Sequence, residues 1–205
     1  MVGSREGENV RVLLVVAHPD AGSFTHACAT TATTALRDAG HHVDVLDLYA
    51  LGVRAAMSAD ERAAYEGDSP LVDPLIAGHA ALVQQADALV FAYPTWWSSF
   101  PAILKGWLDR VMTPGVSFVF DERRIVRPGL RHVRHIVGLT SYGSPRAYVR
   151  LVNDNGRRIL TRMLRLNTAW KAKVTWLGLH AIDTSTDERR AAHLRRIERT
   201  MRALR

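Results

Sequence analysis

Three short stretches of the chain carry residues suited to holding a ligand that is both phosphorylated and planar. The first, "AHPDAGSFTH", places Ser23 and Thr25 at the predicted start of a helix. Unpaired N–H groups at a helix N-terminus attract anions, and hydroxyl groups add neutral donors. The stretch therefore favours a phosphate site, and an ordinary helix cap remains the alternative. It contains neither G-x-G-x-x-G nor a P-loop.

The second stretch, "YPTWWSSFP", places two adjacent tryptophans in a loop stiffened by Pro94 and Pro101. Trp96 and Trp97 offer flat apolar surface with one indole N–H each, as a planar aromatic ligand requires. The competing interpretation is that one of them fills the core or a subunit interface.

The third stretch, "LTSYGSPRAY", could direct the backbone N–H groups of Thr140, Ser141 and Gly143 at the edge of the same planar ring. A phosphate site, a planar wall and edge donors together fit a flavin nucleotide better than an adenine nucleotide.

Alternating strand and helix patterns place these three stretches at one edge of a sheet. Apolar, β-branched runs predict strands at 10–17, 42–48, 86–94, 131–141 and 171–182. Helical spacing predicts helices at 23–40, 73–85, 101–112, 147–164 and near the C-terminus, and 116–120 reads as a short strand or a loop.

This alternation predicts an α/β fold, a flavodoxin-like five-stranded parallel sheet with helices on both faces. Ligands of such sheets bind at the carboxyl ends of the strands, where the three stretches should meet. We expect a single domain spanning 1–205, with 1–9 flexible.

Composition narrows the class of protein. The 205 residues are 47% hydrophobic and 23% charged, as in an ordinary soluble domain. No apolar run approaches the roughly 20 residues of a membrane span, and the N-terminus does not resemble a signal peptide. We therefore expect no integral membrane segment. The lone Cys28 excludes an internal disulfide, so we expect a cytoplasmic protein.

The formal net charge of +7 comes largely from arginine. Nucleic-acid binding would need a recognised module or interleaved aromatic residues, and neither is present, so no nucleic-acid partner is expected. A basic surface would attract anionic substrates such as dinucleotides.

"AHPDAGSFTHA", "YPTWWSSFPAILKGWLDRVMTPGVSFVF" and "LTSYGSPRAY" resemble the NAD(P)H quinone reductase family of flavodoxin-like flavoproteins. The resemblance implies an enzyme with bound FAD or FMN that transfers two electrons from NAD(P)H to a quinone or similar aromatic acceptor by a ping-pong mechanism. It also implies a homodimer with the flavin at the subunit interface, and no metal.

The resemblance also assigns residues by motif position. The flavin's phosphate side would contact His18, Ser23, Phe24 and Thr25. The ring would lie against Pro94, Thr95, Trp96, Trp97 and Ser98. Its pyrimidine edge would bond to Thr140, Ser141, Tyr142 and Gly143, with Tyr148 as the catalytic tyrosine. In the family a histidine follows that tyrosine, whereas here Asp154 stands in its place.

Other functions have weaker support in the sequence. Related ancillary proteins regulate membrane transporters, and a basic face would suit that non-catalytic role. A flavodoxin-type electron carrier is generally acidic, unlike this chain. "VVAHPDAGS" is similar to the A-H-P-D-D-E motif of zinc-dependent deacetylases, but Ala21 occupies the position of the general base. His132 and His135 would point to opposite faces of a strand, so they make poor metal co-ligands.

Overall fold

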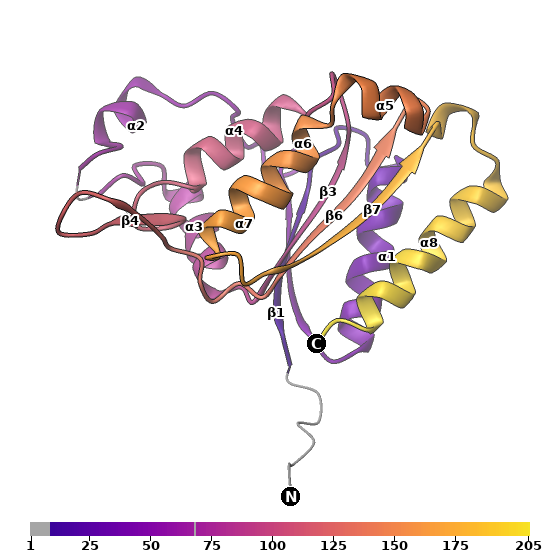
Figure 1. Cartoon of the computed structure of the whole chain (residues 1–205), viewed down its shortest axis with the longest axis horizontal. Helices are drawn as coiled ribbons and strands as arrows, with labels where there is room; N and C mark the ends of the chain where they lie inside the picture. Colours follow the sequence, from indigo (N-terminus) through magenta and orange to yellow (C-terminus); the bar gives the residue numbers. More distant parts are fainter. Residues whose placement is uncertain (1–8, 68) are drawn as a thin grey trace, which may run out of the picture.

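A five-stranded sheet forms the centre of the chain (Figure 1). In the computed structural model, which describes residues 9–67 and 69–205, its strands are all parallel, in the order β2-β1-β3-β6-β7. The bounds are β1 Arg11–Val16, β2 His42–Asp47, β3 Ala88–Pro94, β6 His135–Tyr142 and β7 Lys173–His180. The predicted flavodoxin-like parallel sheet is confirmed. Of the segment predicted to be flexible, only Asn9 lies among the described residues.

Helices cover both faces of the sheet (Figure 1). One face is covered by α1 (Phe24–Asp38) and α8 (Asp187–Arg202), and the other by α3 (Pro74–Gln85), α4 (Ala102–Val111) and the helical segment after α5. Every residue of β3 is buried, because this central strand has helices on both sides. Apolar side chains alternate along the strands and form two separate cores, one on each face of the sheet. For example, Phe91 packs in the core beneath α4 and Val90 in the core beneath α1.

The helix predicted over 147–164 is interrupted, and this part of the prediction is wrong. The structure has α5 (Arg146–Val152), α6 (Asn155–Arg158), the π-helix η1 (Ile159–Leu164) and α7 (Arg165–Asn167). Asn153 adopts a left-handed backbone with φ of 66°, which ends α5. The Asp154 carboxylate then accepts the N–H of Arg157 and starts α6 as its N-cap.

Several smaller elements lie outside the five-stranded sheet. β4 (Phe118–Phe120) pairs with β5 (Val126–Pro128) in an antiparallel hairpin, so the run at 116–120 is a strand. A short helix, α2 (Ala59–Ala64), lies beyond β2, and the 3-10 turn η2 (Ile182–Thr184) follows β7.

The segment before α2 lies against α4 at a glycine. A Cβ on Gly106 would lie 2.0 Å from the Ala55 carbonyl oxygen, a separation that non-bonded atoms do not reach. Glycine at this helix position therefore permits the backbone of residues near 55 to touch α4.

Candidate functional site

The three predicted loops meet in one cleft of about 730 Å³ at the carboxyl ends of β1, β3 and β6. Its size falls within the range of small-molecule sites in proteins. Ten of the predicted residues line it: His18, Ser23, Phe24, Thr25, Pro94, Thr95, Trp96, Trp97, Ser141 and Gly143. The parallel topology is what brings them together, since they come from three separate stretches of chain.

The first loop is fixed by a cap at the start of α1. Ser23 Oγ accepts the backbone N–H of His26 at 3.3 Å and lies 3.0 Å from His26 Nδ1. His26 Nε2 in turn lies 2.9 Å from Asp47 Oδ2 at the end of β2. The predicted N-cap is therefore present, and it holds the N-terminus of a 15-residue helix toward the cleft.

The second loop is a tight turn with a strained backbone. Trp96 and Ser99 exchange backbone hydrogen bonds of 3.1 and 2.9 Å, and the two residues between them have φ of 48° and 56°. Positive φ at both central positions is the geometry of a type I′ turn, which usually needs glycine or asparagine. Here Trp97 and Ser98 occupy them, and the Trp97 side chain is fully exposed at the tip, at 101%. Strain of this kind clusters at functional sites.

Hydrogen bonds anchor the turn on both sides. Thr95 donates its N–H to the Ser141 carbonyl at 2.8 Å, and its hydroxyl lies 2.9 Å from that of Thr140. The Asn155 N–H at the start of α6 donates to the Ser98 carbonyl at 2.8 Å. Thr140 is buried beneath the turn and does not line the cleft.

A side pocket of about 170 Å³ adjoins the cleft. Its walls include Ser98, Tyr142 and Tyr148, the remaining predicted residues, together with Asp154. The half-exposed Tyr148 reaches it from α5. The cleft and the side pocket share Thr95, Trp97, Gly143 and Ser144, so the two hollows are immediate neighbours.

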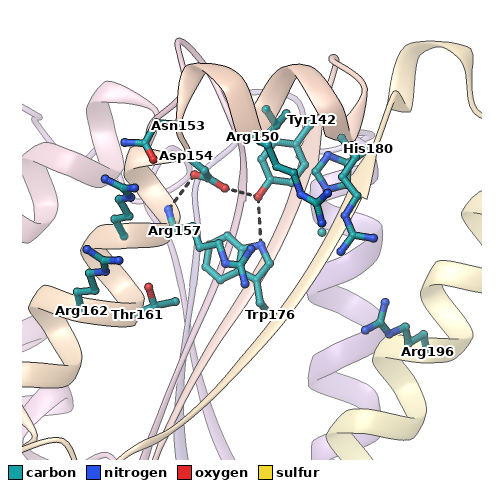
Figure 2. Close-up of a pocket in the computed structure, with 14 residues that line it drawn as sticks. Tyr142, Arg150, Asn153, Asp154, Arg157, Thr161, Arg162, Trp176, His180 and Arg196 are labelled. Atoms are coloured by element: carbon teal, nitrogen blue, oxygen red, sulfur yellow. Dashed lines mark hydrogen bonds between the residues drawn. The ribbon is translucent and has the colours of Figure 1, made fainter.

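The Tyr142 side chain is hydrogen-bonded and stacked against other residues of the chain (Figure 2). Its hydroxyl donates to Asp154 Oδ2 at 2.5 Å and accepts from Trp176 Nε1 at 3.1 Å, and its ring stacks on His180 at 4.3 Å. Burial and the Asp154 carboxylate raise the pKa of Tyr142 well above its ordinary value, so its hydroxyl stays protonated. The side chain therefore faces β7 rather than the large cleft.

Sequence reasoning missed several residues of the site. Ser144, Ile182 and Asp183 also line the cleft, and the last two follow β7 at the same edge of the sheet. Their position after a predicted strand was the available signal.

The remaining reactive side chains have structural surroundings. Burial raises the pKa of the Cys28 thiol to about 12 and keeps it unreactive. His132 and His135 lie near different carbonyls, those of Val83 and Arg205. Within residues 9–67 and 69–205, no three histidine, cysteine or acidic side chains gather as metal ligands would, and no helix there could span a bilayer.

Comparison with known proteins places the chain in a family. A family model described as a flavodoxin-like fold matches residues 10–203. NAD(P)H dehydrogenase (quinone) 1 of Cavia porcellus is 31% identical over 153 residues, which cover 67% of this chain and 55% of that protein. The chain thus spans about half the length of some curated relatives it matches.

Two further relatives match over more of their length. Ribosyldihydronicotinamide dehydrogenase (quinone) of Pongo abelii is 32% identical over 169 residues, 73% of this chain and 71% of that protein. The structure of an NAD(P)H:quinone oxidoreductase from Methanothermobacter marburgensis superposes with a TM-score of 0.80 at 30% identity, covering 95% of this chain and 96% of the other. The chain therefore belongs to the NAD(P)H quinone reductase family of the flavodoxin-like fold.

Proposed function

We propose that the chain is a flavin-dependent NAD(P)H oxidoreductase that transfers two electrons to a quinone or similar aromatic acceptor by a ping-pong mechanism. The observation that carries the proposal is the single cleft in which the capped start of α1, the tryptophan turn and the loop after β6 meet. The names of the relatives support the same activity.

The residues of the cleft fit a flavin nucleotide. The α1 N-terminus suits its phosphate, and the indole of Trp96, close to His18 at 6.0 Å between ring centroids, adds apolar wall. A Cβ on Gly143 would lie 2.8 Å from Asp183 Oδ2, so glycine lets the Asp183 carboxylate approach the loop at this side of the cleft. We expect Ser141 and Gly143 to bond the edge of the ring.

When bound, the flavin supplies the hydride-accepting and hydride-donating chemistry. The chain's own residues position it: the α1 N-terminus fixes the phosphate, and the anchored turn fixes the plane of the ring. Both FMN and FAD carry the phosphate and the ring that these residues fit.

We further propose that the chain functions as a homodimer that closes over the cleft. Trp97 is fully exposed and Leu151, on α5 beside the side pocket, is 83% exposed. Large apolar side chains left open beside a site are typical of an interaction surface. A second copy would cover them and exclude water from the ring.

The decisive experiment is purification followed by a visible spectrum. We expect the absorption bands of oxidised flavin, release of FMN or FAD identified by mass, a sedimentation mass of twice 22.8 kDa, and quinone-dependent NAD(P)H oxidation. A colourless protein that takes up no added flavin would overturn the proposal. A flavin-loaded protein without turnover would instead favour the regulatory role.

Replacing Trp97 by glycine should change stability and flavin affinity in opposite directions. The left-handed backbone costs a non-glycine residue about 1–2 kcal/mol, and glycine would avoid this cost. Part of the gain is lost because glycine has more conformational freedom in the unfolded chain. In apo-protein diluted to the monomer, Trp97→Gly should therefore raise the free energy of unfolding by about 0.5–1 kcal/mol, since this exposed side chain buries no surface. Loss of the wall should weaken flavin binding about tenfold, measured by fluorescence titration.

Ser98→Gly is the matched control, because it relieves strain at the adjacent position and keeps the indole. It should stabilise the apo-protein to a similar extent and leave flavin affinity unchanged. Wild-type flavin affinity in Trp97→Gly would show that the Trp97 side chain does not contact the cofactor.

A further inference from the structure

A basin of about 510 Å³ lies beside the candidate site and is lined by arginines (Figure 2). It forms over the edge strand β7, between the α5–η1 segment and α8. Six exposed guanidiniums surround it: Arg146, Arg150, Arg157, Arg158, Arg162 and Arg196.

The charge of the basin is poorly compensated. Asp154 is the only carboxylate among the lining residues, and none of the six guanidiniums forms an ion pair within the described part of the chain. Arg202, which shares α8 with Arg196, instead pairs with both Asp38 and Glu198. Six guanidiniums facing a single carboxylate make the basin strongly positive in a chain whose formal net charge is +7. Like charges around one basin repel one another, and a bound anion would relieve this repulsion.

The floor of the basin is ordered by aromatic contacts. The Arg157 guanidinium lies over the Trp176 ring at 5.6 Å, and Trp176 is held by its hydrogen bond to Tyr142. Burial and the nearby arginines keep the pKa of His180 below its ordinary value, so this histidine adds no charge at neutral pH. The positive charge of the basin thus comes from guanidiniums, which match phosphate oxygens two at a time.

The basin borders the candidate site. It shares Tyr142, Val149 and Asp154 with the side pocket, which in turn shares Thr95 and Trp97 with the cleft. A ligand with its reactive ring in the cleft could therefore extend charged groups into the basin.

We propose that this arginine basin binds the phosphate groups of the nicotinamide dinucleotide, and that it makes the chain prefer NADPH, with its additional 2′-phosphate, to NADH. The inference rests on the proposed function, because that function makes NAD(P)H the electron donor. A ligand with several phosphoryl groups is the chemical class that uses several guanidiniums at once, whereas a single carboxylate would leave most of them unpaired.

The test is direct binding of adenosine 2′,5′-bisphosphate by calorimetry, which needs neither flavin nor turnover. Wild-type protein should bind it more tightly than adenosine 5′-monophosphate, and the affinity should fall as ionic strength rises. The double variant Arg150→Gln/Arg162→Gln should lose at least about tenfold in affinity. It should also raise the KM for NADPH to a similar extent and the KM for NADH less, because NADH shares the pyrophosphate but lacks the 2′-phosphate.

Arg195→Gln/Arg199→Gln is the matched control, because it removes two exposed charges from α8 outside the basin. Equal losses in both double variants would indicate general electrostatic attraction and overturn the proposal. Absence of bisphosphate binding in an active, flavin-loaded enzyme would also overturn it. Bisphosphate binding that depends on the basin, in a chain that takes up no flavin, would preserve the anion site and overturn the proposed function instead.

Discussion

Arg110→Ala should lower the free energy of unfolding by about 3–5 kcal/mol, the usual cost of removing one partner from a buried ion pair. The Arg110 side chain, on α4, is 1% exposed. Its Nε donates to Glu61 at 2.7 Å, and its terminal nitrogens donate to Asp73 at 2.6 Å and to the Arg54 carbonyl at 2.7 Å. One guanidinium therefore ties α2, the start of α3 and the loop before α2 to α4.

Removing the Arg110 guanidinium would leave the Glu61 carboxylate without its principal cation. Its side chain is 7% exposed, and the exposed Arg54 approaches it only at 3.6 Å. Chemical denaturation of wild type and variant, followed by tryptophan fluorescence, would measure the difference.

The same contacts predict a dependence of stability on pH. Burial alone would raise the pKa of Glu61 and of Asp73, but hydrogen bonds from Arg110 and from backbone N–H groups outweigh it, so both pKa values are lowered. A lowered carboxyl pKa contributes stability above its ordinary range near pH 4, and this contribution disappears as the pH falls through the lowered value. Arg110→Ala should therefore show a shallower loss of stability in acid.

Lys105→Ala is the control on the same helix. Lys105 pairs with Asp109 one turn away, and both side chains are half exposed. Solvent screens such a pair, so its removal should cost no more than about 0.5 kcal/mol. A loss for Arg110→Ala as small as that for Lys105→Ala would contradict the assigned role of the buried network.

The sheet and the meeting of the three loops could be predicted because each depends on a local pattern. β1 and β3 are buried on both faces, so their sequences are almost uninterrupted apolar runs, and their alternation with helices specifies a parallel sheet. A parallel sheet gathers the loops at its carboxyl edge whatever their exact conformation. Family membership was predictable for the same reason, since the motifs lie in those loops.

The break between α5 and α6 could not be read from apolar spacing, because that spacing continues through Asn153 and Asp154. Only a cap-forming aspartate inside an apparent helix marked the break. This break has a functional consequence, since it brings Asp154 to both the side pocket and the basin. The basin itself joins arginines from α5, α6, η1 and the distant α8, a combination that exists only after folding.

The direction of Tyr142 is a tertiary effect as well. A Cβ on Gly178 would lie 2.7 Å from the Tyr142 ring, so the small residue on β7 leaves the space that this ring occupies. The tyrosine consequently turns toward Trp176 and Asp154. Sequence position alone assigned Tyr142 and Tyr148 to the same ligand, whereas their surroundings now separate them.

Tyr148→Phe should lower kcat by about 100-fold, within the range for loss of a general acid or base, and leave stability unchanged. The Tyr148 ring is 54% exposed beside the side pocket, and its hydroxyl has no hydrogen-bond partner within residues 9–67 and 69–205. Unlike the hydroxyl groups of Thr95, Thr140 and Tyr142, it is available to a ligand in the adjoining cleft. Steady-state oxidation of NAD(P)H with a quinone, on protein matched for flavin content, would measure the effect.

Tyr142→Phe should give the opposite pair of results. Removing this hydroxyl leaves Asp154 Oδ2 and Trp176 Nε1 without their partner, which should cost about 1–3 kcal/mol of stability. Because the hydroxyl already donates its proton to Asp154 and accepts from Trp176, that proton is not available to a substrate, and turnover per bound flavin should stay close to that of wild type. If Tyr142→Phe abolished turnover and Tyr148→Phe did not, the proton donor would have to be the buried Tyr142–Asp154 pair rather than the exposed Tyr148.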